Sequence, residues 1–230
     1  YRHKVRLITD QMISRAIALG IEVDEIDELN KLYRYEGTDA FITNYMEWDD
    51  ARFFLEFTSA RHEGKLCHKI ATRLRERRLF KQVFREQIKQ LSEASREPLL
   101  AMFSSDEPNY AAITELEAAL AEAINEVVSD DVNPRFVIAH SFTVKLDSQS
   151  AKNDGANILV ASRPTARDFE SVSALFQALS KGFNERFIEV YAPVTWPNSI
   201  EKKKTLNKLD TAIRKRLEEF FTPQPKGDSA

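Results

Sequence analysis

The sequence changes character within residues 71–84, ATRLRERRLFKQVF. The first part of this stretch continues a long helical run, whereas RLFKQVF, residues 78–84, alternates apolar and polar side chains. Alternation is typical of a half-buried strand, and a spacing of three or four residues between apolar positions is typical of an amphipathic helix. The stretch therefore predicts a boundary between a helical segment, residues 1–77, and a lobe that contains strands, residues 78–221.

Upstream of the boundary, the apolar positions have a helical period. They are Tyr1, Val5, Ile8, Met12, Ala16 and Leu19 in the first predicted helix, which we expect Gly20 to end. A second helix is predicted in residues 22–36, ending at Gly37, and a third begins at Thr38 or Asp39. The helical pattern then continues to about residue 77.

Downstream of the boundary, strands and helices are interleaved. Strands are predicted in residues 135–146, 157–162 and 186–194, and helices in residues 95–105, 110–129, 165–182 and 199–221. The predicted fold class is α+β, with an all-helical N-terminal segment followed by a lobe in which helices flank a small, mostly antiparallel sheet. Residues 222–230 are polar and rich in proline, and we expect them to be disordered.

The overall charge is nearly balanced. The 230 residues include 33 Lys and Arg against 36 Asp and Glu, a net charge of −3, so no global field attracts nucleic acid or an anionic membrane. The one cysteine, Cys67, excludes an internal disulfide, and no apolar run approaches the roughly 18 residues needed to span a bilayer. We expect a cytoplasmic protein with no membrane contact, for which nucleic acid is not the expected partner.

Motifs for catalysis within the chain are absent. The four histidines do not form a metal-ligand set, and His62 and His68, six residues apart, do not share a helical face. There is no HExxH, no CxxC and no glycine-rich phosphate loop, and Cys67 has no partner that would activate it. The sequence therefore predicts neither a catalytic residue nor a metal ligand in this chain.

Two clusters of cations remain as candidate sites. The first comprises Arg2, His3, Lys4 and Arg6, which either hold a phosphate or form a solvated helix face. The second, in residues 69–89, has eight Lys and Arg against Glu76 and Glu86. Phosphate-bearing ligands or nucleic acid would suit this cluster, and so would a polar surface that faces the acidic residues 22–28. The sequence leaves both alternatives open.

The order of several motifs resembles one enzyme family. Residues 1–17, YRHKVRLITDQMISRAI, are similar to the helix that follows the metal core in HD-domain deoxynucleoside triphosphate triphosphohydrolases. Residues 26–46, 71–84 and 135–194 resemble later parts of the same family, so the resemblance covers residues 1 to about 195. It implies that this chain is the C-terminal half of such an enzyme. The divalent metal is then expected in the full-length protein, held by upstream residues, and the chain alone is expected to be inactive.

The resemblance also implies roles for single residues. Tyr1 matches a tyrosine that packs against the sugar of the substrate, although its place on the apolar stripe also fits a core residue. His3 and Lys4 match positions that hold the phosphates of an allosteric nucleotide at a subunit interface. Arg78 and Lys81 match a basic pair that either contacts nucleotide or supports the fold.

The partners that the resemblance implies are therefore a nucleotide, dNTP or GTP, and further copies of the chain in a homo-oligomer. Two alternatives stay open. One is a non-catalytic module for nucleotide binding, regulation or oligomerisation, and the other is a parent enzyme that acts on a different phosphoester.

Overall fold

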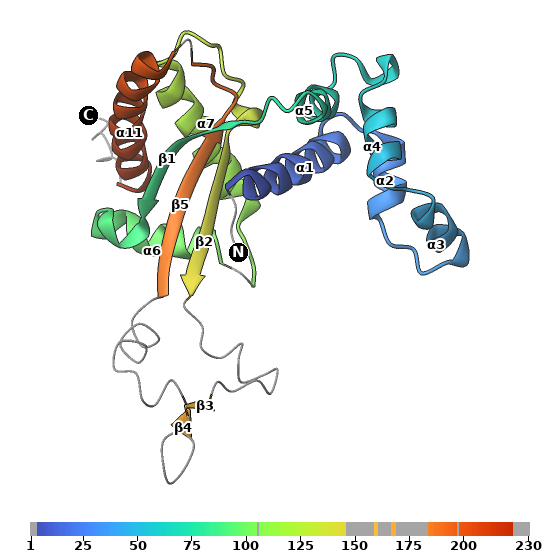
Figure 1. Ribbon diagram of the computed structural model, residues 1–230, viewed down its shortest axis with the longest axis horizontal. Helices are drawn as coiled ribbons and strands as arrows, with labels where there is room; N and C mark the ends of the chain where they lie inside the picture. Colours follow the sequence, from blue (N-terminus) through green and yellow to red (C-terminus); the bar gives the residue numbers. More distant parts are fainter. Residues whose placement is uncertain are drawn as a thin grey trace, which may run out of the picture. The chain divides into compact units, whose positions relative to one another are not determined.

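The computed structural model describes residues 4–104, 106–145, 159–160, 167–168, 184–196 and 198–222. The chain divides into two compact units: unit 1 is Tyr1–Lys81 with Tyr191–Thr195, and unit 2 is Gln82–Val190 with Trp196–Ala230. Helices make up the start of the chain, and a small antiparallel sheet follows (Figure 1). The predicted α+β class is confirmed.

Unit 1 is built from helices: α1 (Lys4–Glu22), α2 (Asp27–Tyr33), α3 (Asp39–Met46), α4 (Asp50–Phe57), a short 3-10 turn (Ala60–His62) and α5 (Leu66–Arg75). Two of them have the side-chain caps that favour helix initiation. The Thr38 hydroxyl accepts a hydrogen bond from the Phe41 N–H at 3.1 Å, and the Asp49 carboxylate accepts one from the Arg52 N–H at 2.7 Å. The predicted start of a helix at Thr38 is confirmed.

Two predicted helix ends are wrong, at Gly20 and at Gly37. Helix α1 continues through Gly20 to Glu22, and α2 ends at Tyr33. A Cβ atom on Gly20 would lie 2.2 Å from Leu29 Cδ1 and 3.3 Å from Cys67 Cβ. A glycine is therefore needed at residue 20 because α2 and α5 approach α1 closely there. Glycine often ends a helix, but at this position its lack of a side chain allows the helices to pack.

Cys67 lies at this contact, fully buried in α5. Burial raises the pKa of the Cys67 thiol to about 12, and the nearby Asp24 carboxylate acts in the same direction. Because the thiolate is the reactive form, we expect an aromatic disulfide reagent at pH 8 to label the native chain about a thousandfold more slowly than the urea-unfolded chain. The folded state should also lose stability as the pH rises above about 9, where the unfolded thiol ionises and the folded one does not.

The measurement is the rate of absorbance change with and without urea, and the unfolded chain is its own control. Equal labelling rates in the two states would contradict a buried thiol.

Unit 2 combines strands and helices. Its elements are β1 (Lys81–Gln87), α6 (Glu93–Met102), α7 (Tyr110–Asn125), β2 (Ile138–Lys145), β5 (Asn184–Ala192) and α11 (Ser199–Phe221). The first residue of β1 and the last two residues of β5 are counted with unit 1. Strand β5 lies between β1 and β2 and runs antiparallel to both (Figure 1). Helix α11 packs against α6 and α7, and α7 contacts β2. Arg214 of α11 joins these layers, since its guanidinium pairs with Glu86 and lies 5.7 Å from the ring centre of Phe84.

The region between β2 and β5 is described in part. Leu159–Val160 (β3) pairs antiparallel with Arg167–Asp168 (β4), with Leu159 opposite Asp168. The start of the helix predicted in residues 165–182 is therefore wrong at Arg167 and Asp168, which are extended. The rest of that predicted helix, the connector in residues 146–158 and the tail from residue 223 lie outside the described residues.

Candidate functional site

The structure describes only some of the five predicted site residues. Tyr1 and His3 lie outside the described residues, and Lys4 is the first residue of α1, with a side chain that is not described. Arg78 lies in the connection from α5 to β1, Lys81 is the first residue of β1, and both are exposed. The candidate site that the structure allows us to build is therefore this connection.

Helix α5 ends in a hydrogen-bonded turn. The Arg77 N–H donates to the Leu74 carbonyl at 3.0 Å, and the Arg78 N–H donates to the Arg73 carbonyl at 2.8 Å. This pair of bonds is the Schellman motif, which satisfies carbonyls at a helix C-terminus and requires a left-handed residue. Arg77 takes that conformation, with φ of 56°.

An arginine at this position is unusual. The left-handed region is favoured by glycine, and for other L-residues it costs about 1–2 kcal/mol per residue. Residues in such conformations concentrate at functional sites, so a strained residue is a reason to look for a function. Arg77 belongs to the basic cluster that the sequence predicted, but nothing in its sequence context indicated its backbone conformation.

The cations at the end of α5, in this connection and at the start of β1 differ in their contacts. We call Arg73, Arg75, Arg77, Arg78 and Lys81 the basic turn. Arg73 lies over the Phe80 ring, with its guanidinium carbon 5.6 Å from the ring centre, Arg75 donates to the Thr58 hydroxyl, and Arg78 pairs with Glu76. Within the described residues, Arg77 and Lys81 are exposed and form no ion pair. Cations near a helix C-terminus also interact favourably with the helix dipole, so the basic turn stabilises α5 even when no ligand is bound.

Replacing Arg77 by glycine should raise the free energy of unfolding by about 1 kcal/mol, because glycine adopts positive φ without steric cost. Arg77→Ala is the matched control, since alanine removes the charge and keeps the backbone strain. Urea unfolding of the two variants separates the effects. Equal stability of Arg77→Gly and Arg77→Ala would show that the backbone conformation carries no strain.

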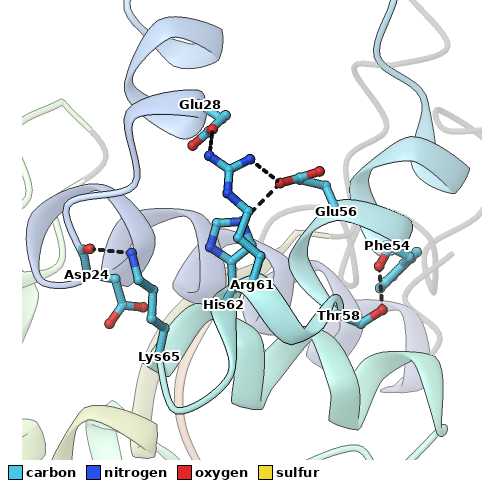
Figure 2. Close-up of polar contacts among 8 residues, drawn as sticks. All are labelled: Asp24, Glu28, Phe54, Glu56, Thr58, Arg61, His62 and Lys65. Atoms are coloured by element: carbon cyan, nitrogen blue, oxygen red, sulfur yellow. Dashed lines mark hydrogen bonds and ion pairs between the residues drawn. The ribbon is translucent and has the colours of Figure 1, made fainter.

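A second polar cluster in unit 1 includes Asp24 and Glu28, two of the acidic residues 22–28 that the basic cluster was expected to face (Figure 2). Arg61 lies between Glu28 and Glu56 and pairs with both. A backbone hydrogen bond, and then the pair with Arg61, lower the pKa of Glu28. The Lys65 ammonium donates to the Asp24 carbonyl at 3.1 Å. These acids therefore contact residues 61–67 and do not neutralise the basic turn.

Asp24 also caps a helix that lies far from it in the sequence. Its two carboxylate oxygens accept hydrogen bonds from the Leu66 N–H at 3.0 Å and the Cys67 N–H at 2.7 Å, the first two residues of α5. A carboxylate at a helix N-terminus satisfies backbone donors and interacts favourably with the helix dipole. Asp24 thus fixes the start of the helix whose other end carries the basic turn.

Asp24→Ala should lower the free energy of unfolding by about 2 kcal/mol, because two backbone donors lose a charged acceptor. Glu22→Ala, at an exposed position nearby, should change it by less than about 0.5 kcal/mol. Thermal and urea unfolding measure both variants. A loss no larger for Asp24→Ala than for Glu22→Ala would contradict the capping role.

His62 has a place that the sequence did not predict. It is 3% exposed, its Nε2 lies 3.0 Å from a Glu56 carboxylate oxygen, and its ring centre lies 5.5 Å from that of Phe57. Its Nδ1 is buried and has no hydrogen-bond partner among the described residues. The sequence around His62 does not indicate that it is buried. Its burial results from the fold of the turn between α4 and α5.

The described residues do not supply a metal centre. Among them, no three His, Cys, Asp or Glu side chains converge to bind an ion. The donor set expected of a metal-dependent hydrolase is therefore not found among the described residues of this chain.

A groove of about 600 Å³ lies between α7 and α11 in unit 2. Its lining includes Lys215, Arg216 and Glu219. Arg216 pairs with Glu122 and Glu126, at 3.5 and 3.3 Å, and Lys215 pairs with Glu219 at 3.6 Å. Lys208 is the third cation of the lining. Because the other two already have carboxylate partners, the groove is a weaker anion site than the basic turn.

Comparison with known proteins gives the family. A family model described as the HD associated region matches residues 1–219. The match covers nearly the whole chain, and the chain belongs to this family. It supports a link to HD-domain proteins, as the motifs of the sequence predicted. No curated protein matches the chain. None of the helices in the described residues is long and apolar enough to span a lipid bilayer.

Proposed function

We propose that this chain is the C-terminal portion of an HD-superfamily, metal-dependent phosphohydrolase, which in its full-length form hydrolyses dNTPs to deoxynucleoside and triphosphate. The family match over residues 1–219 supports the link to HD-domain phosphohydrolases. The order of the motifs in residues 1–17, 26–46 and 71–84 supports the choice of dNTP as substrate. The metal ligands of the full-length enzyme are proposed to lie in its HD core.

The role of this chain in that enzyme is to bind nucleotide phosphates at the basic turn. The observation that carries this role is the exposed, strained Arg77 next to the exposed cations Arg78 and Lys81. A guanidinium presents paired N–H donors that match phosphate oxygens, and several cations on one turn match a polyphosphate. The Arg78–Glu76 pair is exposed, with side chains 59% and 44% accessible, and such pairs are worth little. A phosphate can therefore displace Glu76 at small cost.

Titration calorimetry of the chain with dATP, dGTP and GTP tests this role. Arg77→Gln and Arg78→Gln should each weaken binding roughly fivefold to tenfold, as expected for about 1 kcal/mol per exposed phosphate contact. Glu76→Gln should strengthen binding, because it removes the carboxylate that competes with phosphate. Lys204→Gln, at an exposed position on α11, is the matched control and should leave affinity unchanged. Equal affinity in all four variants would overturn the site.

A separate assay tests the assignment to an HD enzyme. The chain, incubated with dNTPs and Mg²⁺ or Mn²⁺, should release no triphosphate, whereas the full-length enzyme that contains it should. Turnover by the purified chain would overturn the proposal that the catalytic core lies elsewhere. If nucleotide binds and the full-length protein does not hydrolyse it, the alternative of a non-catalytic regulatory module holds.

A further inference from the structure

The groove between α7 and α11 is separate from the residues assigned to nucleotide. It lies within unit 2, has a volume of about 600 Å³, and follows α11 from Asn207 to Glu219. An α-helix rises about 18 Å between two residues at that separation. The volume is in the range of pockets that bind ligands, and the length suits a segment of polypeptide.

The apolar lining of the groove consists of small side chains. Ala123 lies near the C-terminal end of α7, Val127 lies in the turn that follows, and Ala212 lies on α11. The distance between packed helices depends on the size of the side chains at their contact, so small residues allow a close approach. A third helix can therefore lie along the groove and bury these residues against an apolar stripe of its own.

The charges of the lining are distributed unevenly along α11. Lys208 is exposed and forms no ion pair within the residues that the structure describes. Toward the C-terminal end of α11 the lining cations have partners: Lys215 pairs with Glu219 at 3.6 Å, and Arg216 pairs with Glu126 at 3.3 Å. The groove therefore has surplus positive charge at its Lys208 end and carboxylates at its Glu219 end.

Lys204 extends the cationic end of the groove by one helical turn. Residues four apart lie on the same face of a helix, so Lys204 shares a face of α11 with Lys208. It is exposed and, in the described part of the chain, unpaired. Lys202 and Lys203 are also exposed, but the turn of the helix places them on other faces of α11.

We propose that this groove binds an acidic amphipathic helix of a partner protein. The apolar stripe of that helix covers the three small lining residues, as in other helix-in-groove complexes, and its carboxylates pair with Lys204 and Lys208. Complementary charge selects an acidic helix over a basic one. Acids are favoured in the first turn of a helix and cations in the last, so the bound helix has its N-terminus at the Lys204 end and its C-terminus at the Glu219 end. This inference does not rest on the proposed nucleotide chemistry.

Fluorescence anisotropy of the full chain with a labelled synthetic peptide tests the groove. The peptide has about 16 residues, an alanine and leucine stripe at helical spacing, glutamates in its first half and lysines in its last turn. It should bind saturably. A peptide with the two charged ends exchanged should bind about tenfold more weakly, and a scrambled peptide of the same composition should bind more weakly still. Equal or tighter binding of either control peptide would overturn the proposal.

Two pairs of charge variants test whether the peptide lies in the groove. Lys204→Glu with Lys208→Glu should weaken peptide binding about tenfold, because two attractive contacts become repulsive. Lys202→Glu with Lys203→Glu makes the same charge change on other faces of α11 and should alter affinity by less than about twofold, since salt screens distant charges. Equal effects of the two pairs would show that the peptide follows net charge alone, and would overturn the site.

A variant that fills the groove tests the apolar half of the contact. Thr211 is exposed and lines the groove, so Thr211→Phe should abolish peptide binding, whereas Lys203→Phe, at an exposed position outside the lining, should preserve it. Circular dichroism should confirm that both variants are folded. Arg77→Gln with Arg78→Gln should leave peptide affinity unchanged, which separates this site from the proposed nucleotide site. Undiminished binding to Thr211→Phe would overturn the groove as the site of the helix.

Discussion

Leu29→Ala and Gly20→Ala should each destabilise unit 1, and the two together should destabilise it by less than their sum. Leu29 is fully buried, and its removal should cost about 3 kcal/mol because a cavity replaces packed methyl groups. Gly20→Ala should cost about 1–3 kcal/mol because the new Cβ would overlap Leu29 Cδ1. In the double variant, the alanine methyl at residue 20 enters the space that Leu29 leaves.

The measurement is a double-mutant cycle by urea unfolding, with a coupling energy of about 1 kcal/mol or more expected between residues in contact. Trp196→Phe as background leaves Trp48 as the one tryptophan, so that fluorescence reports on unit 1. Ser14→Ala, at an exposed position of α1, is the control and should be neutral or slightly stabilising. Additive losses would show that Gly20 and Leu29 do not meet as the structure places them.

Phe57→Ala should have the largest single effect, a loss of about 3–5 kcal/mol. Phe57 is fully buried and is the one buried residue of α4. Its ring centre lies 4.8 Å from that of Phe53, 5.8 Å from that of Trp48 and 5.5 Å from that of His62. Such aromatic contacts add to the free energy of burial. Without Phe57, helix α4 loses its anchor to the core.

Leu55→Ala provides the comparison, because Leu55 lies in the same helix and is 78% exposed. It should change the free energy of unfolding by less than about 0.5 kcal/mol. Hydrogen exchange should locate the effect: amides of α4 lose protection in Phe57→Ala and keep it in Leu55→Ala. Equal exchange in the two variants would contradict the anchoring role.

The periodicity of the sequence predicted most of the fold. The alternation after Arg78 predicted β1, and the long apolar stripes predicted α7 and α11, because these patterns report directly which side chains face a core. Gly20 was misinterpreted because a helix stop and a close helix contact both favour glycine. The contact depends on Leu29 and Cys67, which the local sequence does not bring together.

Less of the candidate site was predictable. The sequence identified the cationic cluster in residues 69–89 because charge is a property of the sequence itself, and the family resemblance singled out Arg78 and Lys81 within it. The left-handed conformation of Arg77 was not predictable, since arginine is not a residue type that indicates positive φ. The cap that Asp24 forms on α5 was missed for a similar reason, because its partners lie more than 40 residues away in the chain.

Because residues 33–56 include no buried residue, the free energy of opening this stretch locally differs from the free energy of unfolding the whole chain. Local opening of such a stretch exposes little that was not already exposed, so its free energy lies far below that of global unfolding. Amides of Asp39–Met46 should therefore exchange with solvent much faster than amides in the core of α1. The order of this one short helix then depends on its Thr38 cap and on the local contacts of the Phe41 ring, and not on a buried core.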